Sequence, residues 1–279
     1  MWWTKETVSV GLSGSAFASN FLKRHPGKID FIEVAFEQFS ADFDVVGLYP
    51  HIPLLLHSAS LGISQERPAT QETRWAVESV AAQIRSPWVG DHVSYVAAEP
   101  ILEVDRSDPY IVGYTVAPQM NEATLAGACE NVRAARQVLT VPLILENPPV
   151  YFTVPGSTYS QAEFISRICN SENAGLLLDL THLSITCHNL GLDIQSQLDA
   201  LPLDRLLEVH ISGLTKHGGL HWDDHAMPAP PSVFESLGYV FDKASPNAVT
   251  LEYNWQTNFP EELLISQVEH IRRLANACS

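Results

Sequence analysis

The stretch GLLLDLTH, residues 175–182, decides the fold of this chain because an unbroken aliphatic run leads directly into two polar side chains. Five other apolar runs end in the same way, on a histidine or a carboxylate, at residues 54–57, 88–92, 141–146, 206–210 and 249–252. Continuous aliphatic runs are typical of parallel strands buried on both faces, and ligands bind at the carboxyl ends of such strands. The repeated pattern therefore predicts a parallel sheet with a functional site at one edge.

Two further apolar runs, at 8–12 and 29–34, bring the predicted strands to eight. Helical patterns separate most of the strands, at 68–85, 121–139, 160 to about 168, and 260–277. Eight strands that alternate with helices are typical of a TIM barrel, and no GxGxxG turn suggests an open dinucleotide-binding sheet. We therefore expect residues 1–279 to form a single α/β domain, a (β/α)8 TIM barrel with a metal site at the carboxyl-terminal face of its strands.

Two connections, near 93–119 and 212–230, are longer than an ordinary strand-to-helix loop. We expect both to lie over the mouth of the barrel, which is the rim at the carboxyl ends of the strands. The first is predicted to fold as a small hairpin. The second carries several of the chain's histidines and aspartates.

Composition disfavours two classes of partner. The chain has 32 acidic and 16 basic residues, a formal charge of −16, and its long loops carry only Arg106 and Lys216 as fixed cations. Such a surface repels phosphate backbones, so we expect no nucleic-acid partner. No apolar run approaches the roughly 20 residues that span a bilayer, so we expect no membrane partner.

The four cysteines form no C-x-x-C pair and no secretory signal opens the sequence, so we expect reduced thiols in a cytoplasmic protein.

The polar residues at and after the strand ends form the candidate metal site. The candidate ligands are His57, His92, Glu146, Asp179, His182, His210, Asp223, His225 and Glu252. In a barrel all of them would converge on the mouth. Imidazole and carboxylate together suit zinc, iron or manganese, and this many ligands exceed the roughly four to six that one ion takes, so two or three ions are predicted.

Ordinary hydrogen bonding is the simpler explanation for any one of these residues, because most buried polar groups find such partners. Several buried carboxylates at one end of a barrel are harder to explain in this way. Without counter-charge each would cost several kcal/mol, and few lysines or arginines lie near them in the sequence. Metal ions would supply that charge.

Two local spacings sharpen the prediction. Asp179 and His182 are three residues apart where a strand gives way to a turn or helix, so the two side chains can face neighbouring ions. Asp223 and His225 form a D-x-H pair whose side chains would share a face if the segment were extended. Asn147, directly after Glu146, is expected to orient a ligand or the substrate.

With these residues in view, nearly the whole chain resembles the DUF692 family of multinuclear non-heme iron oxidative enzymes, which includes the methanobactin-maturing oxidase subunit. The resemblance depends on segments 55–58, 90–94, 145–147, 178–182, 187–191, 209–213, 223–225 and 251–254. It implies a barrel with two or three iron ions that uses dioxygen to oxidise a residue, most often cysteine, of a ribosomally made precursor peptide. It also implies a small partner protein that presents the leader of this peptide.

The resemblance also assigns the ligands to ions. It implies that His57, His92 and Glu146 hold one ion, that Glu146 bridges to a second ion held by Asp179, His210 and Glu252, and that His182, Asp223 and His225 hold a third. The residues expected to support these ligands or contact the substrate are Asp91, Asn147, Asn189, Asp224 and Asn254. No residue stands out as a catalytic acid or base.

One position departs from the family pattern. The last strand of the family often ends in E-x-D, where this chain has Glu252, Tyr253 and Asn254. The amide of Asn254 cannot supply negative charge, although it can donate and accept hydrogen bonds. Any acid or base role of that aspartate is therefore in doubt here, whereas the ligand role of Glu252 is not.

Three alternatives stay open. The ligand pattern also resembles the trinuclear zinc site of endonuclease IV-like phosphodiesterases, and more loosely the site of xylose isomerase-like enzymes, because these ligands do not choose zinc over iron. The acidic charge argues against a DNA substrate, and no strand-end lysine supports a sugar isomerase. A noncatalytic scaffold would predict an incomplete ligand set.

Overall fold

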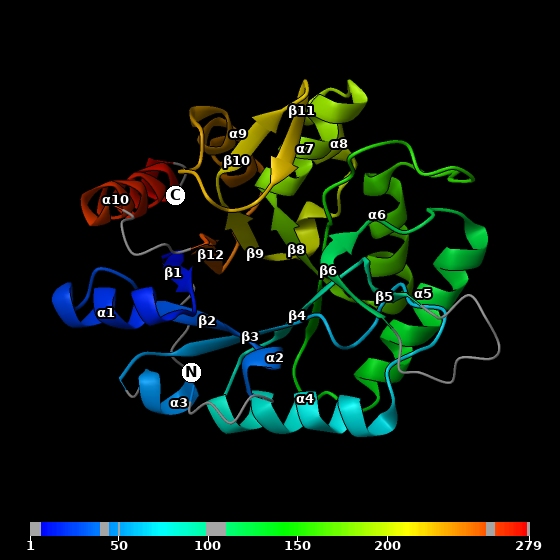
Figure 1. Cartoon of the computed structure of the whole chain (residues 1–279), viewed down its shortest axis with the longest axis horizontal. Coiled ribbons are helices and arrows are strands. Elements are labelled where there is room, and N and C mark those ends of the chain that lie inside the picture. The colour runs from blue at the N-terminus through cyan, green and yellow to red at the C-terminus, as the bar shows by residue number, and fades with distance from the viewer. Residues whose placement is uncertain (1–6, 40–44, 50, 99–109, 255–259, 278–279) are drawn as a thin grey trace.

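The computed structural model describes residues 7–39, 45–49, 51–98, 110–254 and 260–277. It confirms the TIM barrel: eight parallel strands close in the order β1-β12-β9-β8-β7-β4-β3-β2, with helices around them (Figure 1). The barrel strands are β1 (Ser9–Ser13), β2 (Phe31–Ala35), β3 (Leu54–Ser58), β4 (Val89–His92), β7 (Leu143–Glu146), β8 (Gly175–Asp179), β9 (Leu206–Ile211) and β12 (Ala248–Leu251). The strands predicted from apolar runs agree with these to within two residues at each end.

The described helices are α1 (Ala16–Arg24), α2 (Phe36–Phe39), α3 (Val45–Leu48), α4 (Gln71–Ile84), α5 (Glu122–Arg136), α6 (Gln161–Glu172), α7 (Leu180–Leu190), α8 (Ile194–Ala200), the 3-10 turn η1 (Leu203–Arg205), α9 (Pro231–Lys243) and α10 (Glu261–Ala277). Ser160 caps α6 as its sequence predicts, because its hydroxyl accepts from the Glu163 amide. This helix continues beyond the predicted end near residue 168, since Cys169 and Glu172 stay buried. It stops where Asn173 takes a left-handed backbone conformation.

Two layers of inward-facing side chains fill the barrel. Its apolar layer is the cluster of Phe31, Leu55, Trp88, Ile144, Leu177 and Ala248. Alternate residues of a strand share a face, so the next inward positions on four of these strands are Glu33, His57, Glu146 and Asp179. The apolar layer, with Glu208 level with Leu177 and Ala248, therefore forms a floor under a polar layer at the mouth. A separate, larger core lies between the strands and the helices.

The two long connections contain antiparallel strand pairs outside the barrel. Strands β5 (Tyr95–Ala98) and β6 (Tyr110–Val116) pair within the first connection, which was expected to form a hairpin; its Arg106 lies outside the described residues. Strands β10 (Leu214–His217) and β11 (Leu220–Asp223) pair within the second (Figure 1). Among the helices that the structure describes, none combines the length and apolar character needed to cross a membrane.

Candidate metal centre

The predicted ligands meet at the mouth of the barrel in three groups. These groups are His57, His92 and Glu146; Glu146, Asp179, His210 and Glu252; and His182, Asp223 and His225. Within each group, one ligand atom of every residue lies within 4.8 Å of the others. The geometry therefore brings all the predicted ligands together, far apart as they are in the chain.

The first group gathers around one oxygen of Glu146. Its Oε2 atom lies 2.7 Å from His57 Nε2 and 3.0 Å from His92 Nε2. Gly90 makes this arrangement possible, because a Cβ atom at that position would lie only 2.9 Å from the His57 ring. The three ligand atoms converge as they would around a single ion.

The second group faces the other oxygen of Glu146. His210 Nδ1 lies 3.9 Å from Glu146 Oε1 and 3.2 Å from Glu252 Oε2. Asp179 belongs to the same group, and its Oδ2 atom is buried without a hydrogen-bond partner among the described residues. Because its two oxygens face different groups, Glu146 has the geometry of a carboxylate that bridges two ions.

The third group is formed where β8 passes into α7 and where the β10–β11 hairpin ends. Asp223 lies between the two histidines, with Oδ2 3.1 Å from His182 Nε2 and Oδ1 2.8 Å from His225 Nε2. The segment is not extended throughout, because His225 is left-handed, with φ +55°, so the condition under which spacing alone would place Asp223 and His225 on one face is not met. The turn still brings both side chains to the same side, and such strained backbone is typical of functional sites.

Backbone contacts fix the ligands on β8 and α7. Asp179 caps α7 by accepting from the His182 amide through Oδ1, which leaves Oδ2 free to face the second group. Asn147 clamps Asp179 in two hydrogen bonds of 2.9 Å, one to its carbonyl and one from its amide. The Asn147 carbonyl also lies 2.9 Å from His182 Nδ1, so this nitrogen carries the proton and Nε2 is left for an ion.

Two more of the predicted supporting residues shape the hairpin that carries Asp223. Asn189 of α7 holds β11 by hydrogen bonds of 2.9 Å to both the amide and the carbonyl of His221. Asp224 accepts from the Ala226 amide at 3.1 Å and so closes the turn that follows. Both residues thus act on the backbone beside the third group.

Asp91 and Asn254 lie further from the ligand atoms. Asp91 is buried, and its carboxylate accepts from the Leu61 amide at 3.1 Å, in the loop after β3. The side chain of Asn254 is exposed, while its backbone N–H donates a hydrogen bond to the His225 carbonyl at 2.8 Å. The residue that replaces the family's aspartate therefore helps hold the strained turn through its backbone.

Burial and neighbouring charge move the pKa values of the site in opposite directions. Burial lowers the pKa of His57, but the adjacent Glu146 carboxylate outweighs it and raises this pKa to about 10. Burial also lowers the pKa of His225, but the neighbouring Asp223 carboxylate outweighs it and raises this pKa to about 9. Burial is the dominant effect at the other two residues. It lowers the pKa of His92 to about 4 and raises the pKa of Asp179 to about 6. Protonated histidines thus act as counter-ions for the buried carboxylates.

The donor set fits metal ions. Several buried side-chain atoms of the candidate ligands have no hydrogen-bond partner among the described residues, namely Glu146 Oε1, Asp179 Oδ2, Asp223 Oδ1, His92 Nδ1 and both ring nitrogens of His210. Within the same residues, the ion pairs of these carboxylates are with histidines alone. Unpartnered buried atoms of this kind are costly in a protein and are expected where a cation binds.

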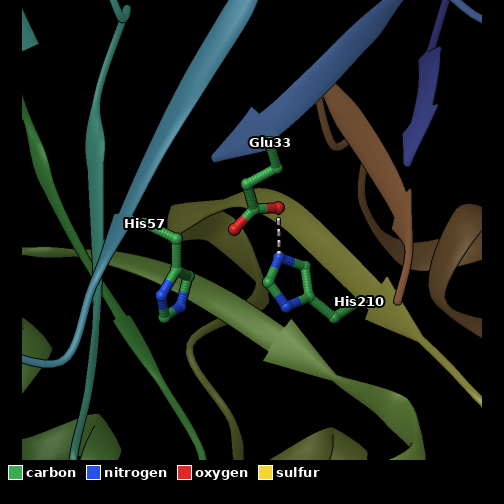
Figure 2. A group of neighbouring side chains, drawn as sticks. All are labelled: Glu33, His57 and His210. Atoms are coloured by element: carbon green, nitrogen blue, oxygen red, sulfur yellow. Dashed lines mark ion pairs between the residues drawn. The ribbon is translucent and has the colours of Figure 1, made fainter. Parts of the chain in front are cut away.

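Two buried carboxylates of the site, Glu33 of β2 and Glu208 of β9, were not predicted from the sequence. Glu33 of β2 lies with His57 and His210 in a further group of potential ligands, and Figure 2 shows its carboxylate facing the His210 ring. Burial and the neighbouring Glu208 raise the pKa of Glu33 to about 7. Both glutamates lie inside a strand, whereas the predicted ligands lie at strand ends or in the segments that follow them. A charge within an apolar run was the available signal.

The fold and the site define a TIM barrel with clustered histidine and carboxylate ligands at its mouth, the arrangement of a barrel enzyme. The family described as RiPP precursor modification enzyme MbnB/TglH/ChrH matches residues 8–276. The chain belongs to this family, whose members modify ribosomally synthesised precursor peptides.

The chain is also similar to other bacterial proteins and to solved structures. A UPF0276 protein of Rhizorhabdus wittichii is 27% identical over 283 residues, covering 96% of this chain and 97% of that protein. A UPF0276 protein of Caulobacter vibrioides is 27% identical over 237 residues, covering 83% and 81%. A D-tagatose 3-epimerase-like structure matches with a TM-score of 0.61 at 13% identity, covering 97% and 99%. The structure of endonuclease IV from Thermus thermophilus matches with a TM-score of 0.56 at 14% identity, covering 97% of this chain and 98% of that chain. The last two show the fold alone.

Proposed function

We propose that this protein is a multinuclear iron, dioxygen-dependent oxidase that modifies a cysteine of a ribosomally synthesised precursor peptide. The observation that carries the proposal is the position of Glu146 between two groups of buried ligands, in a chain whose family modifies such peptides. The nine ligands predicted from the sequence would hold two or three ions. Iron there would supply the redox chemistry that zinc, with its filled d shell, lacks.

The exposure of the ligands gives the direction from which a peptide side chain would enter. The side chains of Glu146, Asp179 and His210 are at most 1% exposed, whereas those of Glu252 and His225 are 20% and 24% exposed. The centre is therefore closed toward the floor and open beside Glu252 and His225. We expect the target cysteine to reach the centre there, with its thiolate attracted to the cations that these residues would hold.

The rim beside this opening suits a peptide better than a phosphodiester. Trp222 is exposed and stacks on Tyr151 with ring centroids 4.8 Å apart, and Met227 is exposed next to the His225 turn. Aromatic and thioether surfaces bind apolar side chains, while a net charge of −16 opposes a nucleic acid. We further propose a small partner protein that presents the leader, and a cytoplasmic location, where the buried cysteines stay reduced.

The test is a mass measurement on a cysteine-containing precursor peptide encoded next to this protein, produced together with the protein and the partner. We expect a change in peptide mass with the wild-type protein in air and none under anaerobic conditions. His210→Ala and Asp179→Ala should each lower the yield of modified peptide by more than about 100-fold, because even outer partners of metal ligands are worth 10–100-fold.

His51→Ala is the matched control, since this exposed histidine precedes β3 at the opposite end of the barrel and should leave the yield unchanged. Stoichiometric zinc, together with hydrolysis of the model diester bis(p-nitrophenyl) phosphate and no change in peptide mass, would replace the proposal with a metal-dependent phosphodiesterase.

A further inference from the structure

His210 stands between two sets of carboxylates, one on each side of its ring. On the mouth side, Nδ1 lies 3.2 Å from Glu252 Oε2 and 3.9 Å from Glu146 Oε1. On the inner side, Nε2 lies 2.9 Å from Glu33 Oε2 (Figure 2). It also lies 3.6 Å from Glu208 Oε1. An imidazole that binds an ion through one nitrogen carries its proton on the other, so the two sides must have different roles.

The mouth side is the better place for an ion. There Nδ1 faces a group with three carboxylates, of Glu146, Asp179 and Glu252. An ion on the inner side would need Glu33, His57 and His210, but His57 already directs Nε2 to Glu146 at 2.7 Å. An inner ion would therefore take one ligand from each of two groups at the mouth.

The inner side is built as a rigid acceptor. Glu208 is held by the Trp88 indole N–H at 2.7 Å and by the Thr250 hydroxyl at 2.6 Å. Glu33 Oε2 has no such hydrogen bond among the described residues, so it is free to accept from His210. Glu33 Oε2 is close enough to His210 Nε2 to form an ion pair, but the N–H of the ring does not point at the oxygen as a hydrogen bond requires.

We propose that Glu33 is a positioning residue of the metal centre: it accepts the Nε2 proton of His210 and so fixes the tautomer that presents Nδ1 to the second ion. Carboxylates that act on metal-bound histidines in this way set the orientation and basicity of the ring. The inference rests on the metal centre of the proposed function, but it requires neither iron, dioxygen nor a peptide.

The test uses zinc as a diamagnetic probe of the full-length protein. In zinc-loaded wild type with ¹⁵N-labelled histidine, NMR should show His210 bound through Nδ1 and protonated at Nε2. Glu33→Gln keeps the shape of the side chain but removes its charge, so zinc should bind one site 10–100-fold more weakly with unchanged stoichiometry at saturation. Glu78→Gln is the control, since this buried carboxylate accepts hydrogen bonds from Thr140, away from the site.

Two results would overturn the inference. Zinc on Nε2 of His210 in the wild type would make Glu33 a ligand, and this measurement needs no variant to fold. Loss of one zinc equivalent at saturation in Glu33→Gln, with Glu78→Gln unaffected, would do the same. Because the probe is zinc and no peptide is present, failure of the oxidase proposal would leave both readouts intact.

Discussion

Glu146 is the residue on which two of the three ligand groups depend. Its Oε2 atom serves His57 and His92, and its Oε1 atom faces the group of His210. Glu146→Gln keeps the volume but leaves an amide that cannot bridge two cations. We expect this variant to lose metal from both groups, with activity reduced by more than about 100-fold. Metal content measured by mass spectrometry checks the prediction.

Glu78→Gln serves as the control for Glu146→Gln as well, because it removes another buried carboxylate and should keep the full metal content. Glu146→Gln protein with a wild-type metal content would show that Glu146 does not bridge the two groups.

The shifted histidine pKa values predict how metal uptake depends on pH. A metal displaces the proton of its ligand, and His225 holds its proton up to a pKa of about 9. Below that pH, each unit of increase should raise the affinity of the third group for zinc at least tenfold, because His182, whose pKa is also raised, must release a proton as well. The dissociation constant of zinc, measured by chelator competition at pH 6.5 and 8.5, should fall by at least about 100-fold. A constant value would contradict the assignment of His225 as a ligand.

The metal-free protein should respond to pH in the opposite direction. The pKa of His225 lies above the ordinary value of 6.5 in the folded state, so its pairing with Asp223 stabilises the fold fully below pH 6.5. This contribution disappears as pH rises toward 9. The melting temperature of the chelator-treated protein should therefore fall between pH 6.5 and 9.

At the level of residues, the sequence predicted which polar side chains would meet but not all of them. Residues at the ends of apolar runs, such as His57 and Asp179, could be found because parallel strands end on the same rim. Glu33 and Glu208 offered only the weaker signal of a charge within an apolar run, because their role depends on the inward direction of a side chain within a strand. That direction is known only once the register of the barrel is fixed.

The β10–β11 hairpin is the element that completes the third group, and its path depends on Gly213. A Cβ atom at this position would lie 1.6 Å from the Met227 carbonyl oxygen, so the chain returning from the hairpin passes directly over the glycine. Gly213→Ala should displace this segment and with it His225. We expect loss of metal from the third group and a destabilisation of about 1–3 kcal/mol, measured by urea unfolding.

Gly127→Ala is the control for Gly213→Ala, because nothing lies within 4 Å of its added Cβ atom in α5. This change should be neutral or stabilise the helix by about 0.5–1 kcal/mol. Equal stability and metal content in the two variants would remove the hairpin from the account of the site.

Elements that follow from local patterns were predicted better than those set by tertiary packing. The Ser160 cap located the start of α6, but its end at Glu172 depends on burial against the barrel. The left-handed turn at His225 was not predicted, because no residue in 223–225 is a glycine that would signal such a backbone. Packing and hydrogen bonds from elsewhere, including the Asn254 amide, hold that turn.

The whole molecule is an acidic barrel in which several of the carboxylates are buried inside the barrel. Of the buried carboxylates, those of Glu33, Glu146, Asp179 and Glu208 lie around a few histidines beneath the mouth. The closure of the barrel was predictable from the number of strands and their alternation with helices. What the side chains do at the mouth was predictable only in kind, because imidazole and carboxylate ligands do not distinguish iron from zinc.

The most direct measurement is anomalous X-ray scattering at the iron edge from crystals of anaerobically purified protein. We predict an iron peak between His57, His92 and Glu146, a second between Glu146, Asp179, His210 and Glu252, and, where the third position is filled, a peak between His182, Asp223 and His225. Glu146 should contact the first two ions through different oxygens. Zinc alone at these positions would contradict the iron assignment, and the absence of any metal peak would contradict the metal centre itself.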